Sequence, residues 1–397
     1  MKVLIVHNYY QQRAGEDAVF EQECRLLTRF GHTVIPYHRT NKEIEEAGTW
    51  GRLRAPLNII WNARSRREFE AVLRAERPDV VHVHNTYFMI SPSIFAACQE
   101  AGVPVVQTLH NYRLFCPNAV FFRDGRACED CRESGLWQGI RHGCYHGARS
   151  DTTVVAAMIK VNRIFGTWPG KVDEFIALTR FSRRKLVEGG LPAERVTVKP
   201  NFVDPDPGQG RGTRDHALFV GRLSAEKGVA IMLRAWSRLD QPVPLKIAGS
   251  GPGQQALEEQ ARREGLRDVE FLGHLPREST MALLRSARFL VFPSVWYEGF
   301  PMTICEAFAC GTPVICSRMG AMEELVEDNG TGLHFGPGDA AELAARAAWA
   351  WEHPDEMSRM GVAARREFEQ KYTAERNHPL LVKIYNGAIE RKRSAAA

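Results

Sequence analysis

Two glutamates, Glu298 and Glu306, flank a predicted helix start in the segment 291-VFPSVWYEGFPMTICEAFACGTPVICS-317. Pro301 suits the first position of that helix, because this position needs no donor N–H. Glu298 then lies just before the free backbone N–H groups of the helix start, which attract anions. Glu306 lies over a turn further in and can accept two hydrogen bonds from a vicinal diol. The segment predicts a seat for a sugar nucleotide, although glutamates that only offset the helix dipole would give the same pattern.

Two cations, Arg222 and Lys227, lie in a second segment, 217-ALFVGRLSAEKGVAIMLRAW-236, between a buried-strand pattern and an apolar helical pattern. Ser224 is typical of an N-cap, and Lys227 then stands where a capping box would place Glu or Gln, so its charge opposes the helix dipole. Sequences often break a local rule at a functional site. Arg222 as a fork and Lys227 as a point charge could hold a diphosphate, the alternative being two solvated surface cations.

Together the two segments resemble the C-terminal domain of the retaining glycosyltransferases of family 4, which have the GT-B fold. The motifs that carry the resemblance there are GRLSAEKG and EGFPMTICEAFACGTPVI. It extends over nearly the whole chain through KVLIVHN, RPDVVHVHN, QTLHNYR, VKPNFVD and IAGSGP.

The resemblance implies a role for each matching residue. Arg222 and Lys227 would contact the donor diphosphate. Glu298 would contact the donor sugar and Glu306 the ribose, while His110 would reach the sugar from the opposite domain. Four of these residues, His110, Arg222, Lys227 and Glu298, form the predicted catalytic set. The remaining donor-binding residues implied are Gly221, Gly249, Gly251, Gly299, Phe300, Pro301, Met302 and Thr303.

Short apolar runs predict two parallel sheets. A chain of 397 residues with 44% hydrophobic residues exceeds the size at which single cores stop growing, about 250–300 residues. Unalternating runs separated by helical patterns are typical of parallel strands covered on both faces. The predicted fold class is therefore α/β, with two Rossmann-like, doubly wound parallel-sheet domains that face each other across a cleft, as the GT-B resemblance implies. The runs are 2-KVLIV, 33-TVIPY, 79-DVVHVH, 103-VPVVQTL, 175-FIAL and 196-VTV, then 217-ALFV, 244-PLKIA, 269-VEFLG, 289-FLVFPS and 313-PVICS.

The predicted acceptor-side domain comprises residues 1–200 and the predicted nucleotide-sugar domain residues 216–374. Residues 201–215 are full of turn formers and predict a linker. Residues 375–397 have a helical pattern, and the resemblance implies that this terminal helix crosses back to the first domain.

Within the predicted linker, Asp204-Pro205-Asp206 spells the Asp-x-Asp that another class of glycosyltransferases uses to hold a divalent metal. Prolines follow both aspartates, and no apolar strand precedes them. These features favour a turn over a metal site.

The acceptor side is predicted from strand ends in the first domain. His110 follows an apolar run, at the carboxyl end of a strand, where ligands collect in open parallel sheets. A neutral imidazole there could donate a hydrogen bond to a sugar hydroxyl, whereas a histidine satisfied within the fold is the alternative. His7 and Asn8 occupy the corresponding tip after the first strand.

The loop 11-QQRAGED-17 resembles the family's glycine-rich acceptor loop, which assigns Gly15 to the acceptor side. Asn111, which directly follows His110, is assigned to the acceptor side as well. Ala14 stands where a second glycine is common. Its methyl group limits how closely a ligand can approach the backbone.

Four of the nine cysteines, Cys116, Cys128, Cys131 and Cys144, fall in one irregular stretch with the spacing C-x11-C-x2-C-x12-C, within a predicted insertion over residues 113–149. A Cys-x2-Cys pair and two further thiolates can close a structural zinc site, which would stabilise an insertion with little core of its own. Two histidines, His142 and His146, are substitute ligands. Reduced thiols, or two disulfides in an oxidising compartment, are the alternatives.

Charge is divided unequally along the chain. Residues 1–200 hold 28 lysines and arginines against 21 acidic residues, a balance of +7, and the remainder has a balance of −2. The stretch 50-WGRLRAPLNIIWNARSRR-67 could rest on an anionic bilayer or hold an anionic lipid-linked acceptor, unless it is an ordinary helix with a solvated basic face.

Several other classes are disfavoured. The chain has no run of 18 apolar residues and begins directly with a strand pattern. We therefore expect a cytoplasmic protein, with the inner face of the membrane as one location. A net charge of +5 without a nucleic-acid-binding signature argues against nucleic acid as a partner.

The predicted function is transfer of a hexosyl group from a nucleoside diphosphate sugar, GDP-mannose or a UDP-hexose, to a glycan or lipid-linked glycan hydroxyl with retention of configuration. The basic first domain favours an anionic lipid-diphosphate glycan as acceptor, in exopolysaccharide or cell-envelope assembly. Preorganised cations would stabilise the departing diphosphate without a catalytic metal. A nucleotide-sugar epimerase of similar fold and a catalytically silent glycan-binding protein are the alternatives.

Overall fold

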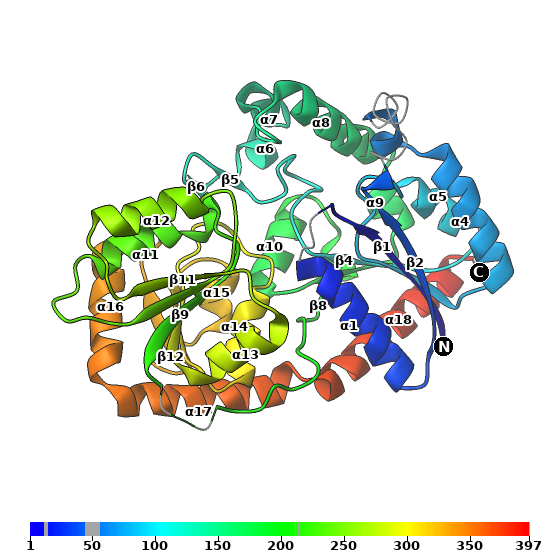
Figure 1. The fold of residues 1–397 in the computed structure, drawn as a ribbon. Coiled ribbons are helices and arrows are strands. Elements are labelled where there is room, and N and C mark those ends of the chain that lie inside the picture. Colours follow the sequence, from blue (N-terminus) through cyan, green and yellow to red (C-terminus); the bar gives the residue numbers. More distant parts are fainter. Residues whose placement is uncertain (12–14, 44–55, 211, 213, 397) are drawn as a thin grey trace. The chain divides into compact units, whose positions relative to one another are not determined.

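The computed structural model describes residues 1–11, 15–43, 56–210, 212 and 214–396, which form two compact units (Figure 1). Unit 1 comprises residues 1–121, 129–200 and 377–397, and unit 2 comprises residues 122–128 and 201–376. The chain thus enters unit 2 briefly at residues 122–128, leaves unit 1 a second time after Pro200 and returns to it at Asn377.

Unit 1 contains a six-stranded sheet of order β2-β1-β3-β4-β7-β8, in which all neighbouring strands are parallel. Its central strands are buried on both faces, as their unalternating apolar sequences predict. All six apolar runs predicted in the first half are therefore confirmed as strands. The strands are β1 (Lys2–Tyr9), β2 (Thr33–Thr40), β3 (Val80–Val83), β4 (Val105–Leu109), β7 (Glu174–Ala177) and β8 (Val196–Val198).

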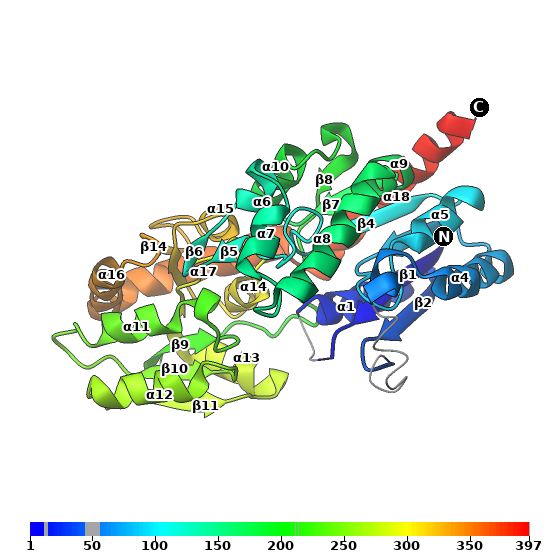
Figure 2. The same ribbon diagram turned by 90° about the horizontal axis from the view of Figure 1, so that it is seen from above.

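Helices cover both faces of this sheet. Figures 1 and 2 show α1 and α18 along one face of the sheet and α4, α5 and α9 along the other. The helices of unit 1 are α1 (Gly15–Arg29), α4 (Ala63–Glu76), α5 (Ser93–Glu100), α6 (Asp130–Glu133), α7 (Trp137–His142), α8 (Arg149–Ile164), α9 (Thr167–Lys171), α10 (Arg180–Glu188) and most of α18 (Ala374–Ala396), with a 3-10 turn at Ala193–Arg195.

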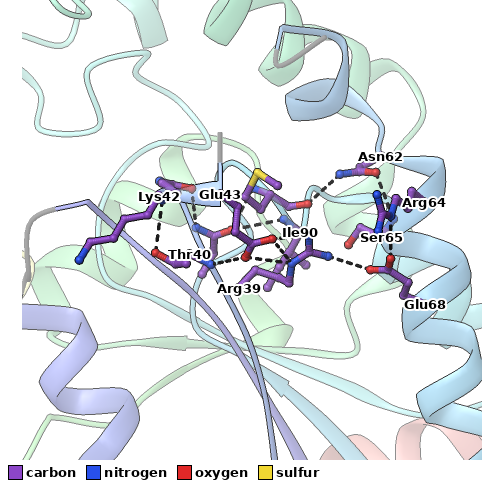
Figure 3. A network of polar contacts seen from close by, with 12 residues as sticks. Arg39, Thr40, Lys42, Glu43, Asn62, Arg64, Ser65, Glu68 and Ile90 are labelled. Carbon is purple, nitrogen blue, oxygen red and sulfur yellow. Dashed lines mark hydrogen bonds and ion pairs between the residues drawn. The ribbon is translucent and has the colours of Figure 1, made fainter. Parts of the chain in front are cut away.

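A polar network joins the edge strand β2 to helix α4 (Figure 3). Arg39 donates to both carboxylate oxygens of Glu43 and, at 2.7 Å, to Glu68 on α4. Asn62 caps α4 by accepting from the backbone N–H of Ser65 at 3.0 Å. These bonds hold β2 and α4 together, and residues 44–55 of the connection between them lie outside the described part of the chain.

Unit 2 contains a second six-stranded parallel sheet, of order β11-β10-β9-β12-β13-β14. Five of its strands match the apolar runs predicted in the second half, and the edge strand β14 has no counterpart among them. The strands are β9 (His216–Val220), β10 (Leu245–Ala248), β11 (Val269–Gly273), β12 (Ala287–Phe292), β13 (Val314–Ser317) and β14 (Gly332–Phe335), and a separate hairpin pairs β5 (Phe122–Arg123) with β6 (Arg126–Ala127).

The core of unit 2 shows how its helices sandwich the sheet. Ala217 and Phe219 of β9 belong to a buried cluster that includes residues of α11, α12 and α16, whereas Leu218 between them faces the opposite side. The helices are α11 (Val229–Trp236), α12 (Gln254–Arg263), α13 (Arg277–Ser286), α14 (Met302–Ala309), α15 (Ala321–Leu325), α16 (Ala340–Glu352) and α17 (Pro354–Lys371), with a 3-10 turn at Ala225–Lys227. Both sheets are doubly wound, as predicted.

Residues 201–210, which were predicted as part of a linker and belong to unit 2, form no helix or strand. Asp206 binds Arg365 through both carboxylate oxygens, at 2.7 and 2.6 Å. An aspartate engaged by a guanidinium in this way fits the predicted turn.

None of the helices in the described part of the chain has the length and apolar character needed to cross a membrane.

Candidate active site

The centre of the site in unit 2 is an ion pair between Lys227 and Glu298. The ammonium nitrogen lies 2.7 Å from Glu298 Oε1, and the Glu298 side chain is 6% exposed. Ser294 Oγ and Trp296 Nε1 donate to the same oxygen at 2.7 and 2.9 Å. Glu298 Oε2 has no hydrogen-bond partner among the described residues. The three donors therefore fix the carboxylate and leave one oxygen to accept from a ligand.

Backbone contacts hold the two loops of this pair together. The carbonyl oxygen of Glu226 accepts from the backbone N–H of Val295 at 2.9 Å, and Ser294 Oγ, which donates to Glu298, lies 3.2 Å from the same oxygen. Since one loop follows β9 and the other follows β12, adjacent strands of the sheet, both lie at its carboxyl edge. Ligands collect at this edge in open α/β sheets.

The helix expected after Ser224 is different in the structure. Residues Ala225–Lys227 form a single 3-10 turn, and α11 begins only at Val229, after Gly228 in the left-handed conformation. Ser224 Oγ donates to the Glu226 carboxylate at 2.6 Å and caps no helix. The predicted conflict between Lys227 and a helix dipole is therefore wrong, because Lys227 precedes the helix.

Arg222 lies on the same loop with its side chain 62% exposed, and its guanidinium donates to Glu226 Oε1 at 2.8 Å. Burial alone would raise the pKa of Glu226, but hydrogen bonds from Ser224 and Arg222 hold that pKa below its usual value. Such an exposed pair can open at low cost when an anion arrives.

Glycines allow the loops after β9 and β10 to approach closely. A Cβ on Gly249 would lie 1.8 Å from the carbonyl oxygen of Gly221, and one on Gly251 would lie 2.5 Å from that of Leu223. Both positions are therefore closed to any side chain, and the backbone at the edge of the sheet remains accessible.

Helix α14 follows the Glu298 loop through Gly299 and the buried Phe300. Pro301 was predicted at the first position of this helix. In the structure α14 begins at Met302, followed by Thr303, so Pro301 lies one position before the helix. The first backbone N–H groups of α14 have no partner within the helix.

Glu306 lies in the middle of α14, where its Oε1 is 3.3 Å from Arg277 of α13. Burial raises the pKa of Glu306, and Arg277 offsets part of this effect. A largely buried carboxyl group with one cationic neighbour can accept hydrogen bonds from ribose hydroxyls.

In unit 1, His110 directly follows β4, as predicted, and is partly exposed. Its Nε2 lies 3.0 Å from Nδ1 of His84, which follows β3. Burial holds the pKa of His110 well below the usual value, so its imidazole is neutral at pH 7.

The other acceptor-side residues differ in their exposure. His7 and Asn8 are fully buried within β1, which runs to Tyr9, so the predicted position after the strand is wrong. His7 Nε2 lies 2.7 Å from Asp17. Asn8 Oδ1 accepts from the backbone of Met89 at 2.9 Å and thereby supports a neighbouring loop.

Gly15 opens α1, and a Cβ there would meet nothing within 4 Å. Asn111 is partly exposed and accepts from the backbone N–H of Arg113 at 3.1 Å. The acceptor loop assigned with Gly15 falls partly on residues 12–14, which lie outside the described residues, as do residues 50–55 of the basic stretch.

All nine cysteines are described and are free of disulfides. Cys116, Cys131 and Cys144 belong to unit 1 and Cys128 to unit 2. In the described part of the chain, the single group of His, Cys, Asp and Glu side chains close enough to share a metal is Glu23, His82 and His84. The four-cysteine zinc site stays a prediction.

Sequence reasoning missed three residues that shape these sites. Ser294 and Trp296 lie inside the segment that drew attention, but nothing in their spacing shows that both reach one carboxylate oxygen. His84 stands in the alternating VHVH pattern after a buried strand, and this polar alternation at a strand end was an available signal.

A cation-held carboxylate and a glycine-lined strand edge, in two doubly wound parallel-sheet units, are the features of the GT-B class of glycosyltransferases. Two family profiles match: "Glycosyltransferase Family 4" over residues 18–207 and "Glycosyl transferases group 1" over residues 206–367. The chain belongs to glycosyltransferase family 4.

Relatives and solved structures agree with this assignment. The chain is 30% identical over 312 residues to a glycogen synthase of Mycobacterium tuberculosis, covering 75% of this chain and 66% of that protein. It is 38% identical over 159 residues to the D-rhamnosyltransferase WbpZ of Pseudomonas aeruginosa, covering 40% of this chain and 41% of that protein. The chain thus spans less than two thirds of the length of these relatives.

Among solved structures, Anabaena HepE in complex with UDP superposes with a TM-score of 0.71 at 19% identity, covering 97% of this chain and all of that one. This likeness confirms the predicted GT-B fold.

Proposed function

We propose that the protein is a retaining glycosyltransferase that moves a hexosyl group from a nucleoside diphosphate sugar, GDP-mannose or a UDP-hexose, to a hydroxyl of a glycan or lipid-linked glycan. The observation that carries the proposal is the ion pair between the half-buried Lys227 and the buried Glu298 at the carboxyl edge of the unit 2 sheet. It combines a cation for the departing diphosphate with a carboxylate oxygen for the sugar. The named activities of the relatives, which transfer sugars, support the reaction class.

In the proposed reaction, the bond between the anomeric carbon and the diphosphate oxygen breaks, and negative charge develops on the leaving nucleotide. A bond from the acceptor oxygen to the anomeric carbon replaces it, and the proton of the acceptor hydroxyl leaves with the nucleoside diphosphate. Lys227 and Arg222 stabilise that charge together with the free N–H groups at the start of α14. Positive side chains in this role need no catalytic metal. Glu298 Oε2 accepts from a hydroxyl of the donor sugar, and Glu306 accepts from the ribose.

We further propose an acceptor of anionic, lipid-linked character and contact with an anionic membrane at the cytoplasmic face, in exopolysaccharide or cell-envelope assembly. The excess of positive charge in residues 1–200 supports this proposal. So do Leu57 and Trp61, whose exposed fractions are 70% and 43%. The guanidinium of Arg66 lies 5.6 Å over the Trp61 ring, an arrangement of aromatic and cation suited to a lipid headgroup layer.

A structural zinc ion on Cys116, Cys128, Cys131 and Cys144 belongs to the same set of proposals. Metal analysis of the purified protein should find one zinc per chain. Replacement of Cys128 and Cys131 by serine should abolish zinc binding without removing donor binding.

Incubation with UDP-glucose, GDP-mannose and related donors tests the proposed reaction class. A transferase without its acceptor should release nucleoside diphosphate slowly from one donor, and added acceptor glycans should accelerate this release. Proton NMR of the product should show the anomeric configuration of the donor. A new sugar nucleotide would instead identify an epimerase, and no turnover of any donor would contradict the proposal.

A further inference from the structure

A chain of three side chains leads from the interior of unit 1 to His110. Glu23 Oε2, on α1, lies 3.2 Å from Nε2 of His84 and 3.4 Å from Nδ1 of His82, and neither Glu23 Oε2 nor His84 Nε2 makes a hydrogen bond of regular geometry with the described residues. Nδ1 of His84 lies 3.0 Å from Nε2 of His110. Glu23 and His84 side chains are fully buried, whereas His110 is partly exposed.

Buried partners keep Glu23 ionised. Lys199 donates to Glu23 Oε1 at 2.7 Å and also contacts Asn377 of α18 at 2.9 Å. Burial alone would raise the pKa of Glu23, but Lys199 and the neighbouring His84 hold it well below its usual range. The Glu23 carboxylate therefore acts only as an acceptor.

The group Glu23, His82 and His84 is close enough to share a metal ion. The Lys199 ammonium supplies the positive charge beside Glu23. Nδ1 of His82 lies 2.8 Å from the Tyr385 hydroxyl and its Nε2 lies 2.8 Å from Thr108. Hydroxyl groups therefore engage both ring nitrogens of His82.

The ionised Glu23 sets which atom donates and which accepts in the contacts from Glu23 through His84 to His110. An ionised Glu23 oxygen 3.2 Å from Nε2 of His84 favours the His84 proton on that nitrogen, and burial holds the pKa of His84 below its usual value, so the ring is neutral. Nδ1 of His84 then carries a lone pair and accepts from Nε2–H of His110. In a neutral His110 this leaves Nδ1 without a proton.

We infer that Glu23 and His84 are positioning residues that lock His110 in its Nε2–H form, so that His110 presents Nδ1 as a hydrogen-bond acceptor to a substrate hydroxyl. This inference rests on the proposed function for the identity of the substrate. It reverses the polarity expected from the sequence, in which His110 donates. A hydroxyl group of the sugar or of the acceptor is the chemical partner that such a nitrogen selects, because a hydroxyl can donate to it.

The tautomer can be measured without any turnover. The protein labelled with ¹⁵N at histidine should show, for His110 at pH 7, a protonated Nε2 and an unprotonated Nδ1 in long-range ¹H–¹⁵N correlation spectra. The His110→Gln variant assigns the signals by their disappearance. A proton on Nδ1, or on both nitrogens, would overturn the inference.

Two replacements of His84 separate positioning from folding. In His84→Asn the amide oxygen can stand near the former Nδ1 and keep accepting from His110, whereas His84→Gln can keep donating to Glu23 but offers no acceptor there. The Nε2–H signal of His110 should persist in the Asn variant and weaken in the Gln variant. Retention of the wild-type pattern in His84→Gln would also overturn the inference, and the thermal unfolding midpoint of each variant reports its folding.

The functional consequence is tested by release of nucleoside diphosphate from UDP-glucose and GDP-mannose. His84→Gln should lower kcat/KM about tenfold to a hundredfold, the scale seen when partners that orient a ligating histidine are removed, and His84→Asn should lower it less. Equal losses in both variants, with the predicted tautomers present, would contradict the positioning role. Absence of turnover in the wild-type protein would count against the proposed function and leave the tautomer measurement intact.

Discussion

At the scale of single residues, the proposed function depends on a cation placed beside a carboxylate. Lys227 and Glu298 were predicted by residue type and by resemblance, and the structure brings them to 2.7 Å. Their distance could not be read from spacing, because they lie on loops after different strands. The roles of Ser294 and Trp296 depend on a turn geometry that emerges only when those loops pack together.

Replacement of Lys227 by alanine removes the ammonium that faces Glu298 and the departing diphosphate. We expect a lower kcat/KM for the preferred donor. The loss should correspond to about 2–4 kcal/mol of transition-state stabilisation, the scale of a preorganised charge donor. The Arg222→Ala variant should lose a similar amount of transition-state stabilisation. The matched control is Lys371→Ala, which removes an exposed lysine paired with Glu367 on α17. Turnover of Lys227→Ala equal to that of the control would rule out the assigned role.

At the scale of elements, the apolar runs predicted most of the architecture. Eleven runs became strands because short apolar stretches between helical patterns have few other stable arrangements. The edge strand β14, sequence GLHF, was missed because it is short and interrupted by glycine and histidine. The loop after β9 was mistaken for a helix start because Ser224 has the side chain of a cap but donates to Glu226 instead.

The close approach of two loops gives a prediction at this scale. Gly249 has φ +148°, and a Cβ there would lie 1.8 Å from the Gly221 carbonyl oxygen, a backbone atom that cannot move aside. Gly249→Ala should therefore destabilise the protein by roughly 3 kcal/mol or more, among the largest effects of single substitutions. Gly265 is the control, since it has φ +70° and open space around it.

The control Gly265→Ala should cost about 1–2 kcal/mol for its left-handed backbone alone. Urea unfolding of both variants measures the difference. Equal losses of unfolding free energy would show that contact between the loops does not constrain Gly249.

At the scale of the whole molecule, a charged network ties the end of the chain to its beginning. Asn377 and Tyr385 of α18 meet Lys199 and His82, which lie in the sheet region of unit 1. The sequence alone showed a helical pattern at this position but not its partners, because the buried Lys199 resembles any lysine until its contacts are known. The fold class followed from periodicity, whereas this closure depends on contacts between residues far apart in the chain.

The most direct test of the central claim, that unit 2 holds a nucleotide diphosphate through its cations, is isothermal titration of UDP-glucose and GDP-mannose into the wild-type protein and the Arg222→Ala, Lys227→Ala double variant. We predict that one donor binds the wild-type protein and that the double variant binds it at least about a hundredfold more weakly, since each lost charge-assisted contact is worth about 1.5–3 kcal/mol. Equal affinity of the two proteins for that donor would contradict the claim.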